Sequence, residues 1–147
     1  MRYTWLIGLM GLLLAGCQPK GDDAQDAGIS PENGLPADFV SFYEQFHRDS
    51  AFQMERIIWP LEGVPDNAGD RLTDRTFRWQ RDEWRIMKPI DVKSSFQREF
   101  LPMSDELIIE KITNNTGQFA LIRRWAIISG DWHLIYYAGM NPVRQGG

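Results

Sequence analysis

The feature that most constrains the fold is a pair of apolar segments near the carboxyl terminus. Segments 119–128 and 132–140 are rich in β-branched and aromatic residues, and they flank Ser129-Gly130-Asp131. Glycine between two such segments favours a tight turn, so the pattern predicts a long β-hairpin. Apolar residues occupy both faces of each arm. A hairpin of this kind lies in the middle of a sheet or is covered by a helix.

An aromatic stripe predicts a helix that begins near Asp38. Phe39, Phe42, Tyr43 and Phe46 are spaced at i, i+3, i+4 and i+7, which places them on one helical face. The carboxylate of Asp38 suits the exposed N–H groups of a first turn. Four large rings on one face must be covered, so the stripe is expected to pack into a core and not to form a ligand platform.

The remaining segments complete an α+β pattern. Residues 49–50 interrupt the first helix, and the apolar positions of 52–58 indicate a second short helix that leads into a strand. Shorter β-favouring segments are expected to form strands at 76–80, 83–87, 95–100 and 107–113. The sequence therefore predicts amino-terminal amphipathic helices packed on a bent antiparallel sheet that ends in the long hairpin.

The amino-terminal end predicts export and a lipid anchor. Arg2, an apolar stretch at 5–14 and small residues before Cys17 are typical of a signal peptide. The apolar stretch is roughly 10 residues, and a membrane-spanning helix needs about 20. Leu14-Ala15-Gly16-Cys17 resembles the lipobox of bacterial lipoproteins. The resemblance implies cleavage before Cys17, a diacylglycerol on its sulfur and a further acyl chain on the new amino terminus.

Such an anchor is stable because two or more acyl chains hold a protein on a bilayer. The alternative is an ordinary secreted protein with one stray cysteine. Cys17 is the only cysteine, so no intramolecular disulfide can form. Gln18, directly after the cysteine, favours the outer membrane over the inner one. The expected location is thus the bacterial cell envelope, on the periplasmic face or the cell surface.

Composition divides the chain into four parts. Residues 1–16 are the signal peptide, and 17–37 are the lipidated cysteine with a linker rich in Gly, Pro and Asp. Residues 38–142 form one α+β domain, and 143–147 form a tail. The chain has 16 basic and 20 acidic residues, which gives a formal net charge of -4. No basic patch is present, so a nucleic-acid partner is not expected.

The two arginines of the hairpin, Arg123 and Arg124, are candidate ligand-binding residues. Neighbouring residues of a strand point to opposite faces, and both faces are otherwise apolar, so at least one arginine should approach the interior. A buried guanidinium needs a carboxylate or an anionic ligand. Either an ion pair with Glu99, Glu106 or Glu110 or a small anion in a pocket satisfies this need.

The histidines and tryptophans offer weaker candidates. His47, on the polar helix face, is expected to be exposed, whereas His133 is either packed or an acid–base group. With only these two histidines and no cysteine cluster, no metal or other cofactor is expected. Trp125 belongs to a tryptophan-rich set that forms either an aromatic core or a sugar-stacking surface. Motifs for a serine nucleophile or a phosphate loop are absent from the sequence.

Two family resemblances add to this interpretation. The hairpin preceded by an amphipathic helix is similar to nuclear-transport-factor-2-like cone folds. The opening of the domain resembles a family of uncharacterised bacterial lipoproteins, domain of unknown function 4348. The residues that carry this resemblance are Asp38-Phe39, Phe42, Phe46, Asp49, Phe52-Gln53, Arg56-Ile57 and Pro60-Leu61. The similarity covers roughly 38–140 and transfers no catalytic residue.

The leading hypothesis is a non-catalytic, membrane-anchored domain that binds a small ligand, a glycan or an envelope protein. The alternative is a cone-fold enzyme, isomerase-like or hydratase-like, that uses His133 with a pocket carboxylate.

Overall fold

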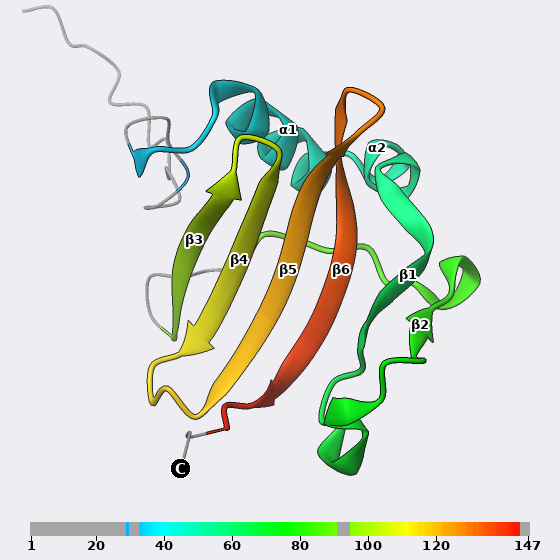
Figure 1. The fold of residues 1–147 in the computed structure, drawn as a ribbon, viewed down its shortest axis with the longest axis vertical. Helices are drawn as coiled ribbons and strands as arrows, with labels where there is room; N and C mark the ends of the chain where they lie inside the picture. Colours follow the sequence, from blue (N-terminus) through cyan, green and yellow to red (C-terminus); the bar gives the residue numbers. More distant parts are fainter. Residues whose placement is uncertain (1–28, 30–32, 91–94, 145–147) are drawn as a thin grey trace, which may run out of the picture.

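Six strands form one curved sheet in the order β2-β1-β6-β5-β4-β3, with helices on one face (Figure 1). The computed structural model describes residues 29, 33–90 and 95–144. The elements are α1 (Ala37–Arg48), α2 (Ser50–Glu55), β1 (Ile57–Val64), the 3-10 turn η2 (Gly69–Thr73), β2 (Arg78–Trp79), the 3-10 turn η3 (Arg81–Glu83), β3 (Phe96–Ser104), β4 (Leu107–Asn114), β5 (Phe119–Ile128) and β6 (Asp131–Pro142). The predicted α+β class is confirmed.

One pairing in the sheet is parallel. Strands β3 to β6 form an antiparallel meander, and β2 is antiparallel to β1, whereas β1 runs parallel to β6. The reason is local: α2 delivers the chain to the end of the sheet where β6 starts, and Leu134 N donates to Arg56 O at 2.8 Å. Both strands therefore leave from the same end, and the sheet is mixed where a wholly antiparallel one was expected.

Helix α1 covers one half of one sheet face with its aromatic stripe. Phe39 and Phe46 are fully buried, and Phe42 and Tyr43 nearly so, as the spacing predicted. Their rings meet tryptophans of the hairpin edge-on: the centroids of Phe39 and Trp132 lie 5.0 Å apart, as do those of Phe46 and Trp125. Edge-to-face contacts of this kind add to the free energy gained from burial alone. The core therefore lies between α1 and the hairpin.

An irregular segment, 84–90, crosses the other half of the same face, behind β5 and β6 in Figure 1. We call it the strap. The predicted strand at 83–87 is wrong, because no neighbouring strand pairs with this segment. A side chain of α2 holds it instead: Met87 N donates to Gln53 Oε1 at 2.7 Å, and Gln53 Nε2 donates to Met87 O at 3.0 Å and to Phe46 O at 2.9 Å.

Element ends differ from the predictions in three further places. β2 contains only two residues, β3 continues to Ser104, and β6 continues through Pro142. Leu35, assigned to the linker, is only 4% exposed and belongs to the core, so ordered packing begins before residue 38. Cys17 and Gln18 lie outside the described residues. Among the helices that the structure describes, none has the length and apolarity of a membrane span.

Candidate functional site

The helix-covered face of the sheet is hollowed beneath the strap. This strap cavity has a volume of about 470 Å3 and is bounded by strap residues on one side and by Leu121, Arg123 and Tyr137 of β5 and β6 on the other. Its size is that of a small-molecule site. Trp79 and Trp84 form part of its wall. The cavity and α1 share one face, and Arg123 lies where the two regions meet.

Arg123 belongs to a buried ion cluster centred on Glu110. Arg123 is 2% exposed and Glu110 is fully buried, and Nη1 of the arginine lies 3.2 Å from Oε2 of the glutamate. Arg98 Nε approaches Oε1 at 3.0 Å, the Tyr43 hydroxyl donates to Oε1 at 2.6 Å, and Trp125 Nε1 donates to Oε2 at 3.2 Å. One of the three carboxylates proposed from the sequence is thus the partner of the inward arginine.

Charge pairing outweighs desolvation at this carboxylate. Burial alone raises the pKa of Glu110, but Arg123, the Tyr43 hydroxyl and Arg98 together hold that pKa below its usual value. The pKa of Tyr43 is raised, because the phenol is buried and lies beside the Glu110 carboxylate. Glu110 therefore stays ionised and Tyr43 stays neutral at neutral pH.

His47 was expected to be exposed, and this expectation is wrong. Its ring packs against Tyr43 with centroids 4.3 Å apart, its Nδ1 lies 2.9 Å from Tyr43 O, and its Nε2 lies 3.3 Å from Arg123 Nη1. Burial and the positive charge of Arg123 lower the pKa of His47 from 6.5 to about 4. In sequence His47 falls on the polar face of the helix. It lies one turn after Tyr43, however, so its imidazole ring reaches the buried cluster.

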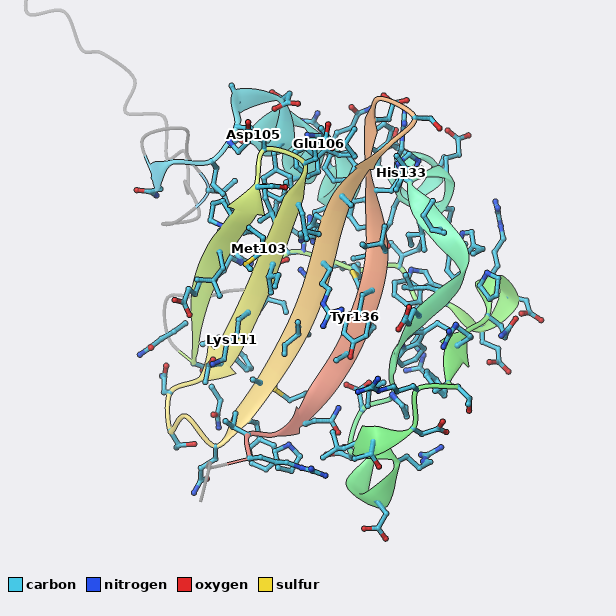
Figure 2. All side chains as sticks on the ribbon, viewed as in Figure 1. Met103, Asp105, Glu106, Lys111, His133 and Tyr136 are labelled. Carbon is cyan, nitrogen blue, oxygen red and sulfur yellow. The ribbon has the colours of Figure 1, made fainter. Side chains whose placement is uncertain are left out.

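Arg124 lies on the opposite face of the sheet. Its guanidinium carbon stands 4.3 Å from the ring centroid of Tyr136, a cation–π contact between neighbouring strands. Figure 2 shows Tyr136 on the face turned toward the viewer, whereas α1 lies behind the sheet in the same view. Both residues border a groove of about 540 Å3, together with Glu62 and Arg75. The two predicted arginines are therefore separated by the sheet.

His133 and Trp125 do not contribute to the strap cavity. His133 lies near the β5–β6 turn (Figure 2), where its Nδ1 is 2.8 Å from Asp131 O. The carboxylate of Asp131 pairs with Arg56 at 2.9 Å. The charge of His133 also acts on Asp131, but neither residue borders the strap cavity, so the predicted couple of His133 with a pocket carboxylate is not found in that cavity. Trp125 is fully buried in the core beneath α1.

The cavity wall is aromatic because of a close backbone approach at Gly63. Trp79 Nε1 donates to Tyr137 O at 2.8 Å, and its indole passes over Gly63. A Cβ at position 63 would overlap both Tyr137 O and the Trp79 indole, so this crossing requires glycine. Trp84 meets Tyr137 edge-on at 5.5 Å. The sequence offered a signal for this wall in its tryptophans, but it did not indicate which of them lie together.

Metal ligation finds no support in the part of the chain that the structure describes. No group of three or more His, Asp or Glu side chains there is arranged to hold a metal ion.

Comparison with known proteins identifies the fold alone. No family model and no curated protein matches this chain. Among solved structures, a cystatin-like protein from Bacteroides caccae has 18% identity and a TM-score of 0.52, over 69% of this chain and 74% of that one. A protein from Bacteroides ovatus has 18% identity and a TM-score of 0.50, over 69% and 73%.

A nuclear-transport-factor-2-like protein from Bacteroides fragilis has 21% identity and a TM-score of 0.48, over 69% of this chain and 46% of that one. The chain thus spans less than half of that protein's length. The likeness to the Bacteroides caccae protein shows a cystatin-like α+β fold. It supports the expected cone fold.

Proposed function

We propose that this chain is a lipid-anchored accessory domain of the bacterial cell envelope, and that the strap cavity binds a small molecule. The anchor rests on Leu14-Ala15-Gly16-Cys17 and on the resemblance of the 38–61 segment to the uncharacterised lipoprotein family, domain of unknown function 4348. Gln18 favours the outer membrane. In this proposal the acylated Cys17 holds the domain on the bilayer, and the domain performs no chemistry of its own.

The observation that carries the binding role is the cavity of about 470 Å3 with a buried arginine at its border. Binding sites of this kind are concave, mostly apolar and contain a few convergent polar groups. The aromatic wall and Arg123 provide that combination. A small molecule is favoured over a glycan, because the tryptophan rings beside the cavity pack against other rings: Trp84 meets Trp79 and Tyr137 edge-on, and Trp79 meets Tyr137 at a tilt.

The anchor is tested with the variant Cys17→Ser. Wild-type protein is expected to sediment with membranes and to incorporate labelled palmitate, and the variant is expected to do neither. A variant that sediments like the wild type would remove the lipid anchor.

Binding is tested by backbone NMR with a library of neutral and charged fragments. We expect shifts that cluster at Leu121, Tyr137 and Ile90. If no fragment at millimolar concentration shifts these residues, the cavity is not a binding site.

A further inference from the structure

One edge of the Arg123 guanidinium has no hydrogen-bond partner. All hydrogen bonds of this group use Nη1, which contacts Glu110, Tyr43 and His47. Nε is buried and has no partner. Nη2 donates no hydrogen bond to any acceptor among residues 29, 33–90 and 95–144. The N–H groups of Nε and Nη2 point in the same direction and form the side-on fork of an arginine.

This fork matches a carboxylate. A guanidinium offers two parallel N–H groups at the spacing of two carboxylate oxygens, which makes such pairs bidentate and stronger than neutral hydrogen bonds. A buried donor without an acceptor is unfavourable, so an acceptor that arrives with a ligand removes that penalty. Arg123 borders the strap cavity, and Glu110 contacts only Nη1 of its guanidinium, so we expect an acceptor in the cavity to reach the Nε–Nη2 fork.

The charge around the cavity favours one negative charge on the ligand. The bordering cations are Arg85, Lys88 and Arg123, and the bordering acids are Asp66 and Glu83. Asp66 is already engaged, because its Oδ1 accepts from Met140 N at 2.7 Å. Three cations and two acids leave an excess of one positive charge at the cavity border, which matches a carboxylate monoanion. A dianion such as a phosphate monoester would exceed this charge and would be repelled by both acids.

The aromatic wall presents carbon surface and few free donors. Trp79 Nε1 is bonded to Tyr137 O at 2.8 Å, and Trp84 Nε1 lies 3.4 Å from Gln53 Oε1. Neither indole N–H is therefore available to a ligand. A polar chain such as an oligosaccharide would find few partners there, whereas a flat apolar group would lose little by leaving water.

From the unpaired fork, the charge balance and the aromatic wall, we infer that the strap cavity binds an organic monocarboxylic acid. Its carboxylate lies on the Nε–Nη2 edge of Arg123, and its flat apolar body lies against Trp79, Trp84 and Tyr137. This inference rests on the proposed function, because it gives the chemical class of the ligand for the same cavity.

The test compares two probes of nearly the same size and shape, one an anionic carboxylate and the other its neutral amide. Calorimetric titration of the full-length protein with 2-naphthoate and with 2-naphthamide is expected to give at least about tenfold tighter binding of the acid. The 15N-detected Nε–H signal of Arg123 is expected to shift on addition of the acid and to stay in place on addition of the amide. This signal needs no variant and reports on the fork directly.

Variants separate the fork from general charge. Arg123→Lys keeps the positive charge and removes the fork, so the preference for the acid over the amide should fall to the roughly two- to threefold that charge alone supplies. Should that variant not fold, Lys88→Gln at the exposed rim is expected to weaken the acid two- to threefold, by about 0.5 kcal/mol. Arg48→Gln, an exposed position of α1 outside the cavity, is the matched control and should leave the affinity unchanged.

Two results overturn the inference in different ways. Equal affinity for acid and amide, with an unmoved Arg123 signal, removes the carboxylate and leaves the cavity as a site for neutral ligands. The same conclusion follows if the acid binds but the Arg123 signal does not move, because the acid then binds away from the fork. Absence of binding by both probes, together with the absence of any fragment shift at the cavity, removes the proposed function as well.

Discussion

His47 is predicted to make the protein less stable in mildly acidic solution. Its Nδ1 lies 2.9 Å from Tyr43 O, a carbonyl that only accepts, so Nδ1 carries the proton. Nε2 faces Arg123 Nη1 at 3.3 Å, and since a guanidinium only donates, Nε2 is the acceptor. Protonation of Nε2 would break this contact and place two positive charges together in a partly buried site.

The magnitude follows from the pKa. Burial and Arg123 lower the pKa of His47 from 6.5 to about 4 in the folded protein. As the pH falls through 6.5, His47 takes up a proton in the unfolded chain but stays neutral in the folded protein. Stability is therefore level above pH 6.5 and is lost between 6.5 and about 4, with a slope of about 1.4 kcal/mol per pH unit and a total of about 3 kcal/mol.

Other shifted groups titrate outside this window. The pKa values of Glu110, Asp74 and Asp131 are all lowered. At Glu110, Arg123 and the Tyr43 hydroxyl outweigh the opposite effect of burial. At Asp74 and Asp131 the main causes are hydrogen bonds from Thr76 and Arg56, respectively. Their contributions to stability are lost only below the ordinary carboxyl range, at about pH 4. The interval from pH 7.5 to 5 therefore reports on His47.

Urea unfolding followed by tryptophan fluorescence measures the effect. The free energy of unfolding should fall by about 2 kcal/mol between pH 7.5 and 5 in the wild type. It should fall much less in His47→Gln, whose side chain does not titrate, while His133→Gln, the other histidine, should retain the full loss. A wild-type protein that is equally stable at both pH values, or a loss that persists in His47→Gln, refutes the argument.

Three other substitutions test the packing around the cavity. Glu110→Gln should lower the free energy of unfolding by about 3–5 kcal/mol, because Arg123 then stays buried without its carboxylate; a loss under 1 kcal/mol in urea contradicts this. Gln53→Leu leaves the backbone of Met87 unpaired, so it should cost about 1–3 kcal/mol and speed hydrogen exchange in the strap; unchanged exchange rates contradict it. Gly63→Ala places a methyl group against the backbone of β6, so it should lower the free energy of unfolding by about 1–3 kcal/mol and with it the thermal midpoint. An unchanged midpoint contradicts the requirement for glycine at this position.

Periodic burial is what made parts of this fold predictable. The stripe of α1 repeats an apolar position at the helical period, and the hairpin joins two long β-favouring segments through a glycine turn; both were found where the sequence placed them. The chemistry of a buried guanidinium similarly limited the partner of the inward arginine to a few acids, and Glu110 is that partner. In each case a local pattern and one physical requirement were sufficient.

Features that depend on contacts between distant segments were not predictable in this way. The strap has apolar residues that suit a strand, yet side chains from other elements hold it: the amide of Gln53 in α2 bonds to the backbone of Met87, and Arg98 Nη2 of β3 donates to Ile90 O at 3.4 Å. Gln53 is fully buried, which no periodicity indicates for a polar residue. The partial burial of His47 has the same origin, because its ring contacts an arginine 76 positions away.

The chemistry of the cavity depends on one irregularity in strand pairing. Trp125 pairs with Leu134 and Arg124 pairs with Tyr136, so Ile135 is an extra residue without a partner, a β-bulge. Strict alternation would place Tyr136 on the face of Leu134 and Tyr137 on the opposite face. The bulge reverses this, and it brings Tyr137 beside Arg123 in the cavity and leaves Tyr136 beneath Arg124 on the other side. The sequence contains two like pairs, Arg123-Arg124 and Tyr136-Tyr137, and composition does not distinguish the members of each pair. The register of β5 and β6 decides which member borders the strap cavity and which borders the groove on the opposite face.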